Sequence, residues 1–297
     1  MSLKQPVQYP VKYYSHLDAD APQLADADGV IKTILKACLV TGYGAKEGAG
    51  WTGLFEGDYR IVLRCPYRAD NAPDIKIENG VINGAASHRV VSQDNPSGLD
   101  DATELAAANL LARDSSNGQE WHLIASDFGF LFLYQMGEYG RDNLPGRNNG
   151  FYLGSASRIN EGDLDYFVYF KQDNIGIDGK TGAPNKGIWT SGMIGNDSQY
   201  LYDTDFYDMR RAILHKGQHF ISSSKSEKFY NNDYFAQSVI VGDAFVLPFW
   251  AAIPSQYSDM KTRTDYIQGR PVLRYANKTG RAYRDRVLYI PLDYWEL

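Results

Sequence analysis

Short aromatic and β-branched runs in the middle of the chain constrain its fold more than any other feature. The four runs are EWHLIAS, FLFLYQM, GFYLGSASRI and LDYFVYF, and Gly, Asn and Asp residues separate them. Runs of this length with turn residues between them are typical of successive antiparallel strands. The chain also contains 22 Tyr, 13 Phe and 28 Gly, which favours many strands joined by tight turns.

Two helices and a hairpin are predicted before these runs. Residues 30–39 carry apolar side chains at helical spacing and are followed by Gly42 and Gly44, which predicts a first helix. Residues 101–113 (DATELAAANLLAR) are rich in Ala and Leu and begin with an Asp-x-x-Glu pattern, which predicts a second helix. Between the helices, the alternation over residues 59–65 predicts a strand, and Asn79-Gly80 predicts a hairpin turn. The expected fold class is α+β and β-rich, with mostly antiparallel sheet and two short helices.

The expected domain organisation has three parts. Residues 1–174 form an α+β region, residues 175–198 form a polar, Gly-rich loop or junction, and residues 199–297 form a β-rich C-terminal region. A chain of 297 residues is long enough for one large domain or two ordinary ones. A single domain therefore also fits the sequence.

Charge and hydropathy set limits on partners and location. The formal net charge of −6 argues against nucleic-acid binding over the whole surface. The N-terminus has no apolar segment of signal-peptide length, and no later run reaches the roughly 18 apolar residues that cross a bilayer. We therefore expect no membrane contact and synthesis in the cytoplasm. Cys38 and Cys65 are expected to be buried thiols.

No motif in the sequence predicts a catalytic residue, a cofactor or a metal. His215 and His219 have the spacing of two ligands on a helix but lack a third ligand. The acidic groups Asp18, Asp20, Asp26, Asp28 and Asp203, Asp205, Asp208 lack a calcium-loop pattern, so we expect solvated turns and leave calcium open. The glycines of residues 42–50 are expected to end a helix, and Asp127-Phe128-Gly129 is expected to be a turn.

Tryptophan and arginine residues are the predicted contact residues. Tyr and Trp provide rigid apolar area with a polar tip, and both are enriched at protein interfaces. Residues 260–286 contain eight basic residues against Asp265 and Asp285, which fits a solvated face, a patch for a neighbouring subunit or a nucleic-acid site. The residues predicted as core or contact residues are Trp51, Trp189, Trp250 and Trp295, together with Arg270, Arg274, Arg281 and Arg284.

The first quarter of the chain resembles the N-terminal region of a family of phage and prophage virion structural proteins encoded among tail genes. In that family an APxL turn precedes a helix ending in a DACLVxGFG-like phrase, followed by a GW-x-K-x-F-x-G phrase and a strand carrying an Arg. The matching residues here are Ala21, Pro22 and Leu24, then Ala37 to Gly44, then Gly50, Trp51, Phe55, Gly57 and Arg64. Lys36 stands where the family usually has Asp.

A second match lies at WHLIASDFGFLFLYQM and GFYLGSASRINEGD, where Glu161-Gly162-Asp163 replaces a proline-containing turn of the family. The matched region runs from Pro22 to Asp163. The resemblance implies a non-enzymatic structural subunit of a tailed bacteriophage particle, located in the virion tail or baseplate. Its expected partners are other tail or baseplate proteins and copies of itself in a symmetric assembly. A polysaccharide- or cell-wall-degrading tail enzyme and a host-receptor or glycan-binding module remain the alternatives.

Overall fold

The computed structural model describes fourteen stretches of the chain, and the observations below concern these residues alone. They are residues 7–25, 27–67, 74–82, 85–110, 120–135, 148–158, 166–171, 188–191, 228–229, 233–241, 245–253, 262–267, 269–277 and 286–296.

One helical segment and nineteen strands make up these stretches. The helical segment consists of α1 (Val30–Lys36) and the π-helical turn η1 (Ala37–Thr41). The strands of the first half are β1 (Gln8–Pro10), β2 (Lys12–Ser15), β3 (Thr52–Gly57), β4 (Arg60–Arg64), β5 (Asp74–Ile82), β6 (Ala85–Asp94), β7 (Thr103–Leu110), β8 (Trp121–Ser126) and β9 (Gly129–Gln135). Those of the second half are β10 (Asn148–Arg158), β11 (Tyr166–Lys171), β12 (Ile188–Ser191), β13 (Lys228–Phe229), β14 (Asp233–Val241), β15 (Phe245–Ile253), β16 (Arg263–Ile267), β17 (Arg270–Asn277), β18 (Arg286–Pro291) and β19 (Tyr294–Glu296).

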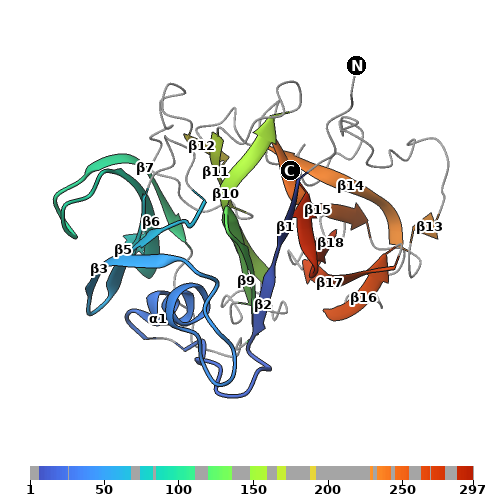
Figure 1. Ribbon diagram of the computed structural model, residues 1–297, viewed down its shortest axis with the longest axis horizontal. Helices are drawn as coiled ribbons and strands as arrows, with labels where there is room; N and C mark the ends of the chain where they lie inside the picture. The colour runs from blue at the N-terminus through green and yellow to red at the C-terminus, as the bar shows by residue number, and fades with distance from the viewer. Residues whose placement is uncertain are drawn as a thin grey trace.

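The strands form three sheets. A five-stranded sheet has the order β3-β4-β5-β6-β7, and a two-stranded sheet pairs β1 with β19. A 12-stranded sheet follows the path β16-β17-β18-β15-β10-β9-β8-β2, with β11 to β14 attached beside it. In Figure 1 strands β9 and β10 lie at the centre, between the five-stranded sheet with α1 on one side and strands β14 to β18 on the other.

Strands β8 and β9 and residues 151–154 of β10 are mostly apolar because both of their faces are buried. Successive side chains of a strand point to opposite faces of the sheet, so a strand covered on both sides needs an apolar residue at every position. Leu123, Phe130 and Phe151 belong to the core cluster that contains the helix. Ile124 and Leu131 belong to the second core cluster, which contains Phe249, Leu273, Leu288, Ile290 and Trp295. These strands confirm the antiparallel order that the sequence predicts.

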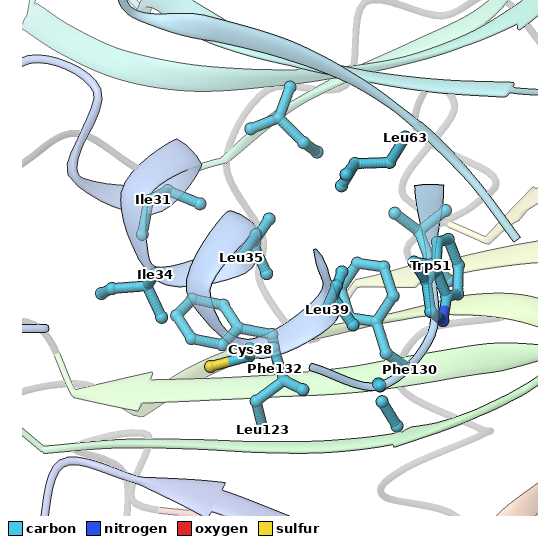
Figure 2. Close-up of a cluster of buried hydrophobic side chains, with 14 of the residues drawn as sticks. Ile31, Ile34, Leu35, Cys38, Leu39, Trp51, Leu63, Leu123, Phe130 and Phe132 are labelled. Carbon is cyan, nitrogen blue, oxygen red and sulfur yellow. The ribbon is translucent and has the colours of Figure 1, made fainter. Parts of the chain in front are cut away.

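The helical segment lies between the two sheets. Its apolar side chains recur at helical spacing, and Figure 2 shows them between Leu63 of β4 and the aromatic residues of β9. The buried helical residues are Val30, Ile31, Ile34, Leu35, Cys38 and Leu39. Gly42 ends the segment with a φ angle of 77°, a conformation that favours glycine. The first helix and both buried thiols are confirmed.

The prediction of a second helix is wrong. Residues Thr103–Leu110 form strand β7, which pairs antiparallel with β6 along most of its length. Ala and Leu favour a helix in isolation, but a neighbouring strand that offers a full backbone ladder outweighs this preference. The fold is therefore β-rich with a single helical segment in the part of the chain described.

The prediction of a turn at Asn79-Gly80 is also wrong. Strand β5 continues through both residues to Ile82, and Asn79 pairs with His88 inside the ladder. The ladder continues to Ile82, which pairs with Ala85 at the start of β6. In the sequence a second Asn-Gly pair stands between these two residues. Asp127 and Phe128, by contrast, form the predicted turn between β8 and β9.

The three-part domain organisation stays a prediction. Strands from both larger regions share the 12-stranded sheet, since Ser157 of β10 pairs with Val246 of β15. Within the expected junction, Ile188–Ser191 forms strand β12, which runs parallel to β11. None of the described helices has the length and apolar character needed to cross a membrane.

Candidate functional site

A buried polar cluster lies where β2 pairs with β8. We call it the Tyr13–His122 cluster, and it consists of Tyr13, His16, Glu120, His122 and Tyr275. The Tyr13 hydroxyl lies 2.9 Å from His122 Nδ1, and His122 Nε2 lies 3.1 Å from Glu120 Oε1. Because Nε2 faces a carboxylate, the neutral imidazole carries its hydrogen on Nε2 and accepts the Tyr13 hydrogen at Nδ1. These two hydrogen bonds satisfy a histidine that is only 3% exposed.

The charges of the cluster follow from its hydrogen bonds and its burial. The hydrogen bond from His122 lowers the pKa of Glu120, although partial burial of the carboxyl acts in the opposite direction. Burial raises the pKa of Tyr13 to about 12. At neutral pH Glu120 is therefore ionised, and Tyr13 remains a protonated hydrogen-bond donor.

His16 extends the pairing of β2 and β8 beyond the last residue of β2. Its backbone N–H donates to Trp121 O at 3.1 Å, and the Trp121 N–H donates to His16 Nδ1 at 3.3 Å. His16 Nδ1 also lies 3.2 Å from Trp121 O, so the ring lies against both backbone groups of Trp121. The ring also meets that of His122 edge to face, with 5.4 Å between ring centroids.

Tyr275 joins the cluster from strand β17. Its ring contacts that of His122 edge to face, with a centroid distance of 5.9 Å. The side chain is fully buried, and its hydroxyl has no hydrogen-bond partner within the described stretches. Burial raises the pKa of this phenol well above its ordinary value. The contact links β8 to β17, which have four strands between them along the path of the sheet.

The glycine-rich segment of residues 42–50 covers the other edge of β2. Lys46 Nζ donates to Tyr13 O at 2.8 Å and forms an ion pair of 2.7 Å with Asp18. The Tyr43 hydroxyl also donates to Asp18, at 2.7 Å. Burial opposes ionisation of Asp18, but the hydrogen bonds from Lys46 and Tyr43 outweigh it and lower the pKa of the carboxyl. The Lys46 side chain thus occupies a backbone acceptor, Tyr13 O, at a strand edge that could otherwise pair with another strand.

The chemistry available to the Tyr13–His122 cluster is proton exchange along a chain of hydrogen bonds. A tyrosine, a histidine and a carboxylate in series can exchange a proton between the phenol and the carboxylate. The raised pKa of Tyr13 makes the phenol a hydrogen-bond donor rather than a nucleophile at neutral pH. Across the described residues, no three His, Cys, Asp or Glu side chains are placed to hold a metal ion.

The predicted tryptophans that can be located lie in the core. Trp51 is 3% exposed, its indole N–H donates to Ser126 O at 3.2 Å, and its ring meets Phe130 edge to face. Trp295 is fully buried in the second core cluster. Trp189 and Trp250 occupy positions in strands β12 and β15, and only their backbone is described.

Two of the four predicted arginines, Arg270 and Arg274, lie in described stretches. Arg270 forms a two-pronged ion pair with Asp293 and lies over the ring of Tyr294, 3.8 Å from its centroid. Arg274 is fully buried. Arg281 and Arg284 lie outside the described residues, as do His215, His219 and the acidic residues 203–208. The basic C-terminal segment therefore includes at least two arginines that contribute to the fold itself.

Sequence analysis missed the Tyr13–His122 cluster because its members are far apart in the chain. Tyr13 and His122 are separated by 109 positions, and register rather than spacing brings them together. One signal was present, namely His122 as the single ionisable residue in the buried run WHLIAS. A histidine in such a run needs partners on its own face, but the run does not identify them.

No protein-family model, no curated protein and no solved structure matches the chain.

Proposed function

We propose that this chain is a structural subunit of a tailed bacteriophage particle, placed in the tail or baseplate and acting through protein–protein contacts. The proposal starts from the resemblance of two stretches, residues 22–64 and 121–163, to virion structural proteins. The observation that supports it most is that these two stretches pack against each other. The indole of Trp51 in the first stretch donates to Ser126 O in the second.

Residues just after the first stretch also contact the second. The Cys65 thiol contacts Asp127 O, and the backbone N–H of Tyr67 donates to the same oxygen at 2.8 Å. Within the first stretch, the backbone N–H of Trp51 donates to Leu39 O in the helical segment at 3.0 Å. The two stretches that carry the resemblance therefore belong to one packed core.

Surface residues suited to assembly lie away from this unit's core. Tyr59 is 51% exposed at the turn between β3 and β4, and Tyr266 is 61% exposed on β16. Leu17 is 78% exposed next to the Tyr13–His122 cluster. Exposed tyrosines supply contact area at low conformational cost, so they suit a subunit that binds neighbouring copies and other tail or baseplate proteins.

A gene interruption tests the proposal. A stop codon early in the gene, suppressed in one host and not in another, is expected to give incomplete tails in the non-suppressing host by electron microscopy. Supplying the wild-type chain from a plasmid should restore complete tails. Particles of normal structure and infectivity without the chain would contradict the proposal.

An activity assay separates the proposal from the enzymatic alternative. If the chain were an enzyme, the hydrogen-bonded series Tyr13, His122 and Glu120 would be the first candidate for its catalytic residues. The purified chain is incubated with host capsule, lipopolysaccharide and peptidoglycan, and we expect no product. Product formation by the wild type that is lost with Glu120→Gln would favour a tail enzyme instead.

A further inference from the structure

Two tyrosine rings meet at the surface where strand β1 lies beside the turn between β8 and β9. Tyr9 belongs to β1, and Tyr67 follows β4. Their rings meet edge to face, with 6.1 Å between the centroids and 71° between the ring planes. Tyr67 is 38% exposed, Tyr9 is partly exposed, and Asp127 in the neighbouring turn is exposed. We call these three residues the Tyr9–Tyr67 corner.

The fold holds this corner in position. Tyr9 lies opposite Trp295 in the β1–β19 ladder, and its ring meets the buried ring of Phe128 at a centroid distance of 4.8 Å. The backbone N–H of Tyr67 donates to Asp127 O at 2.8 Å. Because these contacts already order the three residues, little conformational entropy is lost when a ligand binds to them.

The polar groups of the corner have no partner in the part of the chain that the structure describes. Neither phenol hydroxyl forms a hydrogen bond there, and the Asp127 carboxylate forms neither a hydrogen bond nor an ion pair. Burial is the main cause of the raised pKa of the Cys65 thiol, and the Asp127 carboxylate raises it further, so the carboxylate lies close to Cys65. Because phenols are neutral at pH 7, the carboxylate gives the corner a negative charge.

Elsewhere in the chain the same kinds of group hold an arginine. The Asp293 carboxylate accepts two hydrogen bonds from Arg270, at 3.1 and 2.9 Å, and the guanidinium lies 3.8 Å from the centroid of the Tyr294 ring. A carboxylate and a neighbouring phenol ring thus bind one guanidinium through an ion pair and stacking. The Tyr9–Tyr67 corner offers a carboxylate and two phenol rings, but no Arg or Lys of the described stretches forms an ion pair or a cation–π contact with them.

We propose that the Tyr9–Tyr67 corner binds an arginine side chain of a partner protein. The guanidinium would stack on the ring of Tyr67 and donate to the Asp127 carboxylate, while the ring of Tyr9 forms a second wall. The phenol hydroxyls can accept further hydrogen bonds, because a guanidinium carries five donors. Lysine fits less well, since its ammonium group does not stack flat on a ring or donate to both carboxylate oxygens in one plane.

This inference deepens the proposed function, because it names the chemistry of a partner, and it rests on that function only for placing the partner in the tail or baseplate. Binding of an arginine peptide can be measured with no virion protein present. Failure of the peptide to bind would leave a place in the particle open, and absence from the particle would leave the peptide result open. The two failures are therefore distinguishable.

A short peptide with one arginine between glycines is the probe. The full chain is produced with labelled tyrosine, its ring signals are followed by NMR, and Tyr→Phe variants assign the signals of Tyr9 and Tyr67. We expect these two signals to shift with added peptide and to saturate at millimolar concentrations, because a single exposed cation–π contact and ion pair bind weakly.

Two further peptides separate charge from shape. Citrulline in place of arginine keeps the planar group but removes the positive charge, so this peptide should shift neither ring. Lysine keeps the charge but loses the planar group, so its affinity should be about threefold lower than that of the arginine peptide.

Variants of the chain test which residues bind the peptide. Asp127→Asn removes the charge of the corner and Tyr67→Leu removes the stacking ring, so each should weaken binding about fivefold. Tyr59→Leu is the matched control, because Tyr59 is 51% exposed next to Asp58 and contacts no second ring among the described residues. Its affinity for the peptide should equal that of the wild type. Circular dichroism confirms that each variant is folded.

Several results would overturn the proposal. Equal shifts with the arginine and citrulline peptides would show that the positive charge is not recognised, and no shift with either would show that the corner does not bind arginine. Unchanged affinity in both Asp127→Asn and Tyr67→Leu would place the binding elsewhere on the chain. Shifts with a neutral oligosaccharide such as maltotriose, and none with the arginine peptide, would assign the corner to glycan binding instead.

Discussion

Gly129 and Gly154 lie opposite each other in the β9–β10 ladder, with no room for a side chain between them. A Cβ atom added to Gly129 would lie 2.8 Å from Gly154 Cα and 2.9 Å from both Leu153 O and the Tyr152 hydroxyl. Two of these three atoms belong to the backbone, which cannot move aside without disturbing the ladder. The absence of side chains at both positions therefore leaves room for the Tyr152 hydroxyl beside the β9–β10 ladder.

Substituting Gly129→Ala is expected to lower the free energy of unfolding by about 1–3 kcal/mol, the usual cost of overpacking. Gly53→Ala is the control, because its nearest neighbour would be Ile61 Cδ1 at 3.5 Å, an ordinary contact distance. Urea unfolding of both variants measures the difference. Equal stability of the two variants would show that the ladder yields at Gly129.

The two buried tryptophans allow a hydrogen bond to be measured against a matched control. Trp51→Phe removes the indole N–H that donates to Ser126 O, whereas the Trp295 N–H has no partner among the described residues. Both changes remove the same volume from a core. We expect Trp51→Phe to cost about 1 kcal/mol more than Trp295→Phe in chemical unfolding. A larger loss with Trp295→Phe would mean that packing, not the hydrogen bond, decides the order.

Acid is expected to destabilise the fold partly through Glu120 and Asp18. Both carboxyls have a lowered pKa in the folded chain, so both stabilise it fully above the pKa of an unfolded carboxylate, about 4. This stabilisation is lost as the pH falls through the lowered folded values. The urea midpoint should therefore fall between pH 6 and pH 3, and less steeply in Glu120→Gln.

Glu47→Gln is the control for this pH dependence, because the Glu47 side chain is 92% exposed. Its unfolding midpoint should follow the wild type over the same range. If Glu120→Gln also follows the wild type, the hydrogen bond with His122 does not contribute to acid stability.

Arg270 is expected to stabilise the chain itself. Its guanidinium donates to both oxygens of Asp293 and to Tyr294 O at 2.6 Å, which a lysine ammonium cannot reproduce. Arg270→Lys should lower the free energy of unfolding by roughly 1–2 kcal/mol. Arg60→Lys should cost less than about 1 kcal/mol, because its partner Asp100 is largely exposed. Unchanged stability of Arg270→Lys together with weaker self-association would instead favour a role in subunit contact.

The central strands and the first helix could be predicted because local pattern and final environment agree. Strands β8 and β9 are buried on both faces and mostly apolar, while the helix is buried on one face and shows the helical period. Strand β7 could not be predicted, because ELAAANL favours a helix locally and only its pairing with β6 makes it a strand. The prediction of the hairpin turn was wrong for a similar reason. Two Asn-Gly pairs lie four residues apart in the sequence, and only the strand register shows that the first pair lies inside the ladder.

The Tyr13–His122 cluster shows the limit of linear patterns. The β2–β8 register places Tyr14 opposite Leu123 and Ser15 opposite His122, and this pairing brings the Tyr13 hydroxyl to His122. No spacing along the chain encodes that register. The hydrogen bond of Trp51 could not be predicted either, because its acceptor, Ser126 O, lies 75 positions away in the chain.

The composition of intact particles tests the central claim most directly. Particles of the phage or prophage that encodes this chain are purified by density gradient, and their proteins are quantified by mass spectrometry relative to the major tail and capsid proteins. The account predicts that the chain is present at a fixed ratio to the tail proteins, which repeated purification does not change. A chain that is absent from intact particles, or that washes away to a variable residue, would contradict it.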